Sequence, residues 1–193
     1  MCVAAWLIAV VAGVYVVQRN TSTPAAALAA PKSWPAGAGL PPLTKPCMVL
    51  FVHPECPCFA ADVYILRRLV DASARLDTRL VLVGDDAPIL RESTNYRRAA
   101  ELPGITIHFD ADGQMARAFG AQASGHAAVY DAGGQLVYSG GLTNARGQAG
   151  PSAQDDVVRD VAHGRSPRVN SGPVFGCPLF DAPGENAKKE PPP

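Results

Sequence analysis

Apolar residues along the chain fall into short runs and helical spacings that alternate, a pattern typical of an α/β domain. The run MVLFVH at residues 48–53 is almost wholly apolar and has a proline on each side, which predicts a short strand buried on both faces. From Phe59 the spacing changes, because apolar side chains recur every three or four residues, at Val63, Leu66 and Val70. That spacing predicts an amphipathic helix directly after the strand.

The rest of the pattern continues this alternation. We expect strands at 79–84 and 105–109, helices at about 88–101, 110–120 and 152–163, and a hairpin at 126–140. The early strand-helix-strand units imply parallel strands, and the hairpin adds antiparallel ones. The sequence therefore predicts a mixed sheet of about five strands, flanked by helices.

The first 17 residues are almost all apolar, and Gln18, Arg19 and Asn20 follow them. About 16 helical residues at ~1.5 Å each span roughly 24 Å, slightly less than a ~30 Å hydrocarbon core. The Ala-Leu-Ala at residues 27–29 has the composition of a signal-peptide cleavage site, but it lies far from the apolar run, and no basic segment precedes that run. An uncleaved membrane anchor at residues 1–19 is therefore favoured over a cleaved signal peptide.

Composition divides the remaining chain. Residues 20–45 are rich in Pro, Ala and Gly without periodicity, which is typical of a semi-extended linker, and residues 183–193 have the composition of a disordered tail. Between these segments lie the predicted domain at 46–164 and an extension at 165–182 that contains a cysteine. The 17 basic and 17 acidic residues are scattered, which gives no electrostatic footprint for nucleic acid.

Cys56 and Cys58 flank one proline at the predicted junction between the first strand and the first helix. Proline is favoured at the first helical position, so we expect Cys56 at the N-cap and Cys58 at the second helical residue. Both sulfurs would then lie near unpaired backbone N–H groups and the positive end of the helix dipole, which lowers a thiol pKa. The motif therefore indicates thiolates, the species needed both for disulfide exchange and for soft-metal binding.

Two cysteines compete as the partner of Cys56. A disulfide to Cys58 would close a very small ring, which is strained and easily reduced. A bridge from Cys56 or Cys58 to Cys177 would close a loop of about 120 residues, which the chain-entropy model values at roughly 4–5 kcal/mol. Such a bridge would serve equally as a redox pair or as a staple for the extension. Cys47 lies about 20 Å from Cys56 along the strand, too far for a disulfide, and is expected to be a small buried residue.

The element order, with a cysteine motif at the first strand-to-helix junction, resembles the thioredoxin fold over about residues 46–164. More narrowly, the segments FVHPECPCFAAD, FGAQASGHAAVYDAGGQLVYSGGLT and VFGCPL resemble membrane-anchored proteins called RedB-like, which are relatives of the extracytoplasmic TlpA and ResA groups. The resemblance implies a thioredoxin-like three-layer α/β fold beyond an N-terminal transmembrane helix. It also implies a periplasmic or cell-surface domain that reacts with protein thiols or disulfides and requires no cofactor.

In the thioredoxin pattern Cys56 takes the place of the attacking cysteine, whereas the second cysteine of a C-x-x-C motif would fall at Phe59. Thioredoxins also carry a cis-proline that faces these cysteines, next to the backbone that aligns the substrate. The matching loop has no proline here, and Gly125 or His126 stands in its place. The resemblance therefore makes Ser124, Gly125 and His126 the expected substrate-binding residues.

A second resemblance concerns metal. The segment GHAAVYDAGG is similar to the strand start of the Sco copper-delivery proteins, in which two cysteines and a histidine bind copper. Carried over to this chain, the candidate ligands are Cys56, Cys58 and His126, a set that suits Cu(I) or Zn(II).

Three hypotheses about function follow from these observations. The first is a membrane-anchored thiol–disulfide oxidoreductase in which Cys56 attacks and Cys58 or Cys177 resolves the mixed disulfide. The second is a non-enzymatic metal-binding module. The third is a non-catalytic scaffold in which Cys177 forms a permanent disulfide with one of the other two cysteines.

Overall fold

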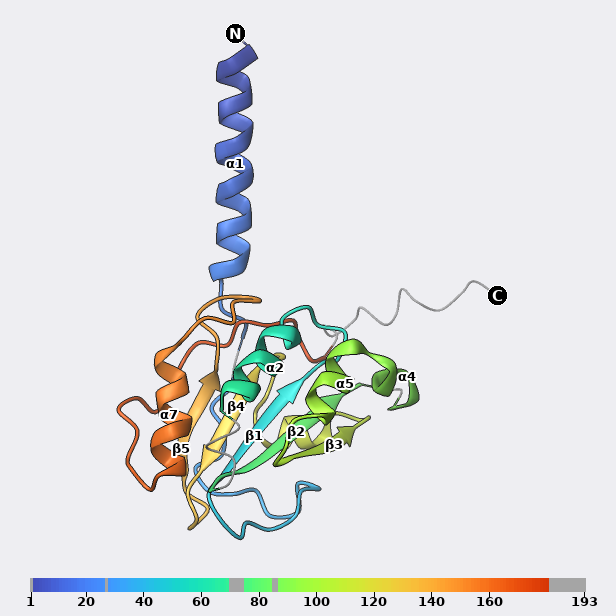
Figure 1. Cartoon of the computed structure of the whole chain (residues 1–193), viewed down its shortest axis with the longest axis vertical. Helices are drawn as coiled ribbons and strands as arrows, with labels where there is room; N and C mark the ends of the chain where they lie inside the picture. Colours follow the sequence, from blue (N-terminus) through green and yellow to red (C-terminus); the bar gives the residue numbers. More distant parts are fainter. Residues whose placement is uncertain (1, 27, 70–74, 85–86, 181–193) are drawn as a thin grey trace.

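The computed structural model describes residues 2–26, 28–69, 75–84 and 87–180 (Figure 1). In chain order the elements are α1 Cys2–Ser22, β1 Cys47–Val52, α2 Phe59–Arg68, β2 Asp77–Val83, α4 Ala87–Glu92, α5 Thr94–Ala100, β3 Ile105–Asp110, α6 Gln114–Ala118, β4 His126–Tyr130, β5 Leu136–Gly141 and α7 Ala153–Ala162. The predicted core position Val70 and the predicted tail at 183–193 lie outside the described residues.

In the described part of the chain the strands form one five-stranded sheet in the order β3-β2-β1-β4-β5. β1 and β3 each run parallel to β2, whereas β4 runs antiparallel to both β1 and β5. All six residues of β1 are buried, because this strand lies at the centre of the sheet and both faces are covered. The predicted mixed sheet of about five strands is confirmed.

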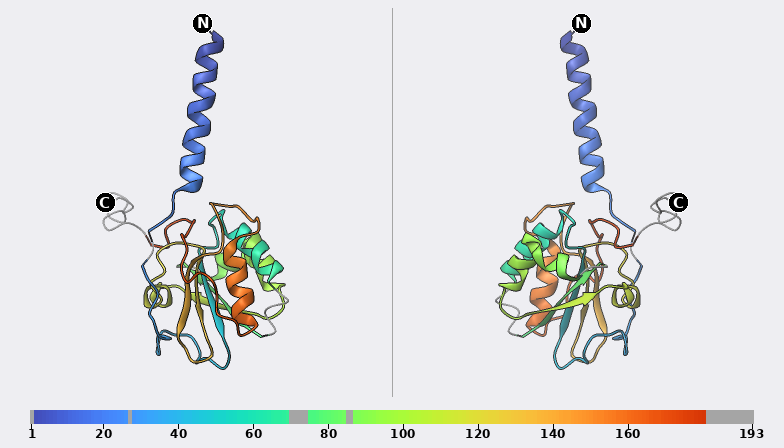
Figure 2. Two further views of the ribbon diagram at one scale, coloured as in Figure 1. Left: turned by 90° about the vertical axis from the view of Figure 1, so that its left-hand side faces the viewer. Right: turned by 90° about the vertical axis from the view of Figure 1, so that its right-hand side faces the viewer.

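Two hydrophobic cores cover the two faces of the sheet. Met48, Leu50 and Val52 of β1 pack into the core beneath α2, α5 and α7. Val49 and Phe51 alternate with them and pack into a second core with α6 and the N-terminal segment. Figure 2 shows the two layers on opposite sides of the sheet. The expected three-layer arrangement is therefore present.

The second core contains a segment that the sequence pattern assigned to a linker. Ala30 and Leu40 are buried, and the ring of Trp34 makes edge contacts with Phe119 and Tyr130 at centroid distances of 5.1 and 5.3 Å. The expectation of a free spacer over residues 20–45 is wrong for this part, because its few apolar side chains fill the uncovered face of the sheet.

The helix predicted at about 88–101 is divided into α4 and α5. Ser93 has an extended backbone (φ −62°, ψ 141°), and its side chain accepts a hydrogen bond from the N–H of Tyr96. Serine in this conformation is a strong N-cap, so it starts a new helix where the apolar spacing alone predicted a continuous one.

α1 projects from the domain (Figure 1). It continues past the expected end at Arg19 to Ser22 and has 21 residues, so it measures about 31 Å at ~1.5 Å per residue, of which the polar residues 18–22 form the last part. It is long and apolar enough to cross a membrane, although a signal sequence has the same properties.

Candidate functional site at the first strand-to-helix junction

Cys56 lies in the turn between β1 and α2. The N–H of Cys56 donates to the carbonyl of His53 (2.9 Å), and the N–H of Phe59 donates to the carbonyl of Cys56 (3.0 Å). α2 begins at Phe59 with Cys58 as its N-cap. The expected position of Cys56 at the N-cap is therefore wrong, because Pro57 takes part in this turn and does not open the helix.

The sulfur of Cys56 lies 3.1 Å from the sulfur of Cys177, a residue 121 positions away in the sequence. Both residues are free thiols in this structure. A further approach of about 1 Å would bring the two sulfurs to disulfide bonding distance. Of the two partners that the sequence left open for Cys56, the structure brings Cys177 into direct contact.

Cys177 belongs to a segment, residues 171–180, that we call the C-terminal arm. Its backbone pairs with the loop before β4: the N–H of Ser124 donates to the carbonyl of Cys177 (2.8 Å), and the N–H of Leu179 donates to the carbonyl of Gln122 (2.9 Å). Ala123 and Pro178 form an antiparallel bridge between these two bonds. The arm therefore holds Cys177 against the domain in a defined register.

The arm is also fixed by packing. Val174, Phe175 and Leu179 are buried. Between them Gly176 crosses so close to the domain that a methyl group on it would lie 1.8 Å from the carbonyl oxygen of Ser124. Only glycine allows this approach, and it places the next residue, Cys177, beside Cys56.

The thiol pKa values distinguish Cys56 from its neighbours. Burial raises the pKa of Cys56, but hydrogen bonds from Cys177, from the Cys58 backbone and from the Ser124 hydroxyl outweigh that effect and hold it below the usual thiol value. Burial, together with the charge of Cys56, raises the pKa of Cys58 to about 11. Burial and the contact with Cys56 raise the pKa of Cys177 to about 11 as well. Cys56 is therefore the first of these three thiols to become a thiolate.

Asp62 is a candidate residue that the sequence pattern did not single out. Its side chain is buried within α2, and its Oδ2 atom has no hydrogen-bond partner among the described residues. The carboxylate packs against Gly125, where an added methyl group would lie 3.4 Å from Oδ2. Burial, and to a smaller extent the nearby charge of Cys56, raises the pKa of Asp62 well above its usual value. A buried acidic side chain with a raised pKa thus lies near enough to Cys56 to respond to its charge.

The loop that replaces the expected cis-proline lies next to the cysteines. The Ser124 hydroxyl accepts a hydrogen bond from the N–H of His53 (3.0 Å), and the N–H of Gly125 donates to the carbonyl of Phe51 (2.8 Å). Gly125 has φ +88°, and no peptide bond among the described residues is cis. The loop therefore reaches the site through a left-handed glycine, and a substrate-binding role for Ser124, Gly125 and His126 stays a prediction.

His126 is buried at the start of β4. Its Nε2 atom lies 2.9 Å from the hydroxyl of Ser139, and burial lowers its pKa to about 4. Within the described ranges, no three His, Cys, Asp or Glu side chains are arranged to hold a metal ion. Cys56, Cys58 and His126 are not gathered into such a group here, and a metal-binding role for them stays a prediction.

The loop between β5 and α7 covers the other side of the cysteines. The backbone of Gly147 interacts with the Cys58 thiol and lowers its pKa against the larger effect of burial. The guanidinium of Arg146 donates to the carbonyl of Gly176 (2.5 Å), and its positive charge lowers the pKa of Cys177 against the larger effect of burial. This loop thus contacts both Cys58 and the C-terminal arm.

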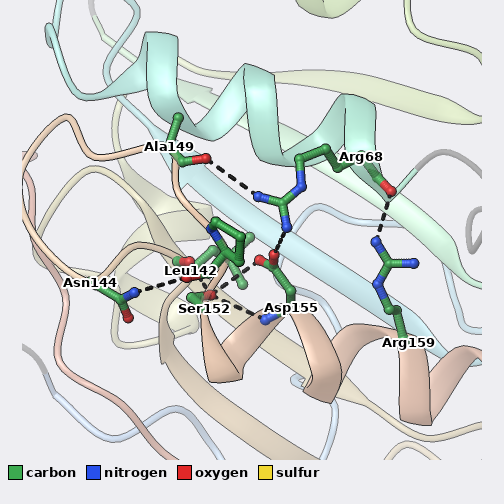
Figure 3. Close-up of polar contacts among 8 residues, drawn as sticks. Arg68, Leu142, Asn144, Ala149, Ser152, Asp155 and Arg159 are labelled. Atoms are coloured by element: carbon green, nitrogen blue, oxygen red, sulfur yellow. Dashed lines mark hydrogen bonds and ion pairs between the residues drawn. The ribbon is translucent and has the colours of Figure 1, made fainter.

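A polar network anchors this loop to two helices (Figure 3). Arg68 at the end of α2 forms an ion pair with Asp155 in the first turn of α7 and donates to the carbonyl of Ala149 (3.3 Å). The hydroxyl of Ser152, which also caps α7, donates to the carbonyl of Leu142 (2.9 Å). Both ends of the loop are therefore held in place.

No protein-family model matches the chain, and no curated protein matches its sequence. Solved structures do match its fold. A hypothetical protein from Sinorhizobium meliloti 1021 is 24% identical and has a TM-score of 0.57, with 85% of this chain and 96% of that chain covered. An uncharacterized conserved protein from Geobacillus kaustophilus is 17% identical and has a TM-score of 0.58, with 85% and 93% covered.

The domain has a thioredoxin-like fold. A secreted disulfide oxidoreductase from Mycobacterium tuberculosis, homologous to DsbE of E. coli, is among the similar structures, at 20% identity and a TM-score of 0.44, with 62% of this chain and 81% of that chain covered. Likeness at this level says nothing about activity.

Proposed function

We propose that the protein is a membrane-anchored thiol–disulfide oxidoreductase whose redox pair is Cys56 and Cys177. The observation that carries this proposal is the 3.1 Å contact between the two sulfurs, combined with the lowered pKa of one partner only. A redox pair needs one thiol that ionises readily and attacks, and a second thiol within reach that resolves the product. Cys56 meets the first requirement and Cys177 the second.

The reaction needs no group beyond the two cysteines and a partner. The Cys56 thiolate attacks one sulfur of a partner disulfide, whose S–S bond breaks, and the second partner sulfur leaves as a thiolate that takes a proton from solvent. Cys177 then loses its proton to solvent and attacks the Cys56 sulfur, which forms the Cys56–Cys177 disulfide and releases the first partner sulfur. Two electrons pass from the cysteine pair to the partner, and the reverse sequence oxidises a partner dithiol.

The properties of α1 and the compartment that a disulfide requires indicate where in the cell the domain lies in this proposal. α1 is long and apolar enough to act as an anchor, and a stable disulfide requires an oxidising compartment. We therefore assign the domain to the extracytoplasmic side, periplasmic or cell-surface, with protein thiols or disulfides as partners. The narrower relationship to RedB-like proteins of the TlpA and ResA groups, suggested by the sequence segments, belongs to the same proposal.

Trapping of the mixed disulfide tests the proposal. The reduced full chain in detergent is mixed with a protein disulfide such as insulin, quenched with acid and alkylated, and covalent adducts are counted by mass spectrometry. We expect wild type and Cys58→Ser to yield oxidised protein and free insulin thiols. The double variant Cys58→Ser, Cys177→Ser should accumulate an adduct through Cys56. Absence of that adduct, or its persistence in Cys56→Ser, would contradict the assignment.

The reduction potential separates this proposal from the scaffold hypothesis. A structural disulfide in a secreted protein has a potential below about −300 mV, whereas a redox pair lies in the range of about −270 to −120 mV. Equilibration of the full chain with glutathione or dithiothreitol buffers gives the potential directly. A potential of about −270 to −120 mV supports the oxidoreductase, and a potential below about −300 mV supports a structural disulfide.

A further inference from the structure

The end of α1 is bonded to the same segments that build the redox site. The carbonyl of Thr21, in the last turn of α1, accepts a hydrogen bond from the N–H of Arg146 (3.0 Å), and the N–H of Ala25 donates to the carbonyl of Val174 in the C-terminal arm (2.8 Å). The anchor therefore does not leave the domain at an arbitrary point. It leaves at the loop and the arm that hold Cys58 and Cys177.

Arg146 connects the anchor to the sulfurs. Its backbone bonds to Thr21, while its guanidinium donates to the carbonyl of Gly176, the residue before Cys177. The next residue, Gly147, interacts through its backbone with the Cys58 thiol and lowers the pKa of that thiol. Only one loop thus separates the end of the helix from the cysteines. Figures 1 and 2 show α1 rising from this end of the domain in every view, beside the loop and the start of α2.

The apolar length of α1 sets the depth of this loop relative to a membrane. Val17 is the last residue of the apolar run, and Thr21 follows four residues later, which is about 6 Å along a helix at ~1.5 Å per residue. The polar headgroup layer on each side of a bilayer is about 5–8 Å deep. With the apolar run in the hydrocarbon core, Thr21 and the bonded Arg146 lie at the outer edge of the headgroups.

We propose that the redox site faces the membrane surface, and that its partner is a membrane-held protein that presents a cysteine pair or disulfide at that surface. This inference rests on the proposed function and on an α1 that is retained in the mature protein. A folded domain of 100 residues has a radius of gyration of about 13 Å, so it is far wider than a gap of one loop and one headgroup layer. A soluble folded partner cannot reach the cysteines from the membrane side, whereas a membrane-held segment already lies there.

A longer tether tests the inference. The full chain is reconstituted in phosphatidylcholine vesicles beside a variant with about 20 Gly and Ser residues inserted between Thr23 and Pro24, which adds a mean reach of about 25 Å. A control variant has the same insertion between Met1 and Cys2, at the opposite end of α1. Reduction of the Cys56–Cys177 disulfide is followed with dithiothreitol and with reduced soluble thioredoxin as the protein probe.

We expect dithiothreitol to reduce all three proteins at the same rate. Soluble thioredoxin should reduce wild type and the control variant at least tenfold more slowly than the long-tether variant. Equal rates with thioredoxin would overturn the membrane-facing placement and leave the redox pair intact. Failure of any form to produce the Cys56–Cys177 disulfide would overturn the proposed function and this inference with it, and so would a mature protein that lacks α1 by mass.

Discussion

Cys56 is the most acidic of the three clustered thiols because its immediate neighbours stabilise its charge. The sequence predicted a reactive thiolate here but attributed it to the N-terminus of the following helix. In the structure that position belongs to Cys58, and Cys56 depends on hydrogen bonds from Cys177 and Ser124. The lowered pKa predicted for Cys56 thus has a different physical cause, whereas the lowered pKa predicted for Cys58 is wrong, because burial raises it to about 11.

The hydroxyl of Ser124 gives the first prediction. Ser124→Ala removes one hydrogen bond to the thiolate, worth about 1–2 kcal/mol, and so raises the pKa of Cys56. Alkylation of Cys56 by iodoacetamide at pH 7 should therefore slow about 3- to 10-fold. Ser166→Ala, at an exposed serine, is the matched control and should react like wild type. An unchanged rate in Ser124→Ala would show that the hydroxyl does not act on the thiolate.

Asp62 gives a prediction about stability. Its pKa in the folded state lies well above the usual 3.8, so its stabilising contribution is fully present below about pH 4 and is lost as the pH rises toward the folded-state pKa. We expect the free energy of urea unfolding of the reduced wild-type protein to fall over this pH range. The variant Asp62→Asn, which cannot ionise, should not show this fall. Asp112→Asn, at an exposed aspartate, should show the same dependence of unfolding free energy on pH as wild type. Parallel stability curves for wild type and Asp62→Asn would contradict the buried carboxyl.

The position of Asp62 illustrates what the sequence could not predict at this scale. An aspartate off the apolar stripe of a helix is normally solvated, and nothing in its local pattern marks it as buried. It becomes part of the site because the loop at Gly125 closes over it, which is a contact between distant parts of the chain.

At the scale of elements, strands and helices were predictable because their apolar spacing is local. Two elements differ from the expectation: the N-cap at Ser93 divides one predicted helix into two, and packing places part of a predicted linker over one face of the sheet. The C-terminal arm was not fully predictable from the sequence either. The sequence left the partner of Cys56 open, and only the structure shows the register of the arm against Ser124.

Gly176 tests that register. Gly176→Ala introduces a methyl group 1.8 Å from a backbone oxygen, so the arm must shift and the Cys56–Cys177 contact is lost at a cost of about 1–3 kcal/mol for overpacking. The yield of the Cys56–Cys177 disulfide after mild oxidation should fall strongly. Gly150→Ala, where a methyl group meets no atom within 4 Å, should form the disulfide normally. Equal yields in both variants would contradict the arm's close approach.

Removal of the ion pair between α2 and α7 tests whether it stabilises the fold around the loop between β5 and α7. Asp155→Ala leaves Arg68 without its partner, and because Arg68 is partly exposed we expect a loss of about 1–3 kcal/mol in the free energy of unfolding. Asp156→Ala changes the exposed neighbour in the same helical turn and should cost less than about 0.5 kcal/mol. Chemical denaturation of both variants measures the difference. Similar losses of unfolding free energy in the two variants would show that the ion pair adds no specific stability.

At the scale of the whole molecule, the order of strands and the mixed sheet were predictable from the element sequence, because parallel crossovers and hairpins leave few arrangements. The pairing of cysteines was not, since two partners were compatible with the spacing. The structure favours Cys177 because the arm crosses the loop before β4 and brings a residue 121 positions away to 3.1 Å. It thereby brings Cys56, Cys177, the arm and the end of α1 together at one end of the domain.

Disulfide mapping of the full chain tests this account most directly. The protein is oxidised mildly, its free thiols are alkylated, and the peptides are fragmented in the mass spectrometer so that each sulfur is located. We predict one cross-link among the five cysteines, between Cys56 and Cys177, with Cys2, Cys47 and Cys58 alkylated once the protein is unfolded. A bond between Cys56 and Cys58, or a Cys177 that stays free under the same oxidation, would contradict the account.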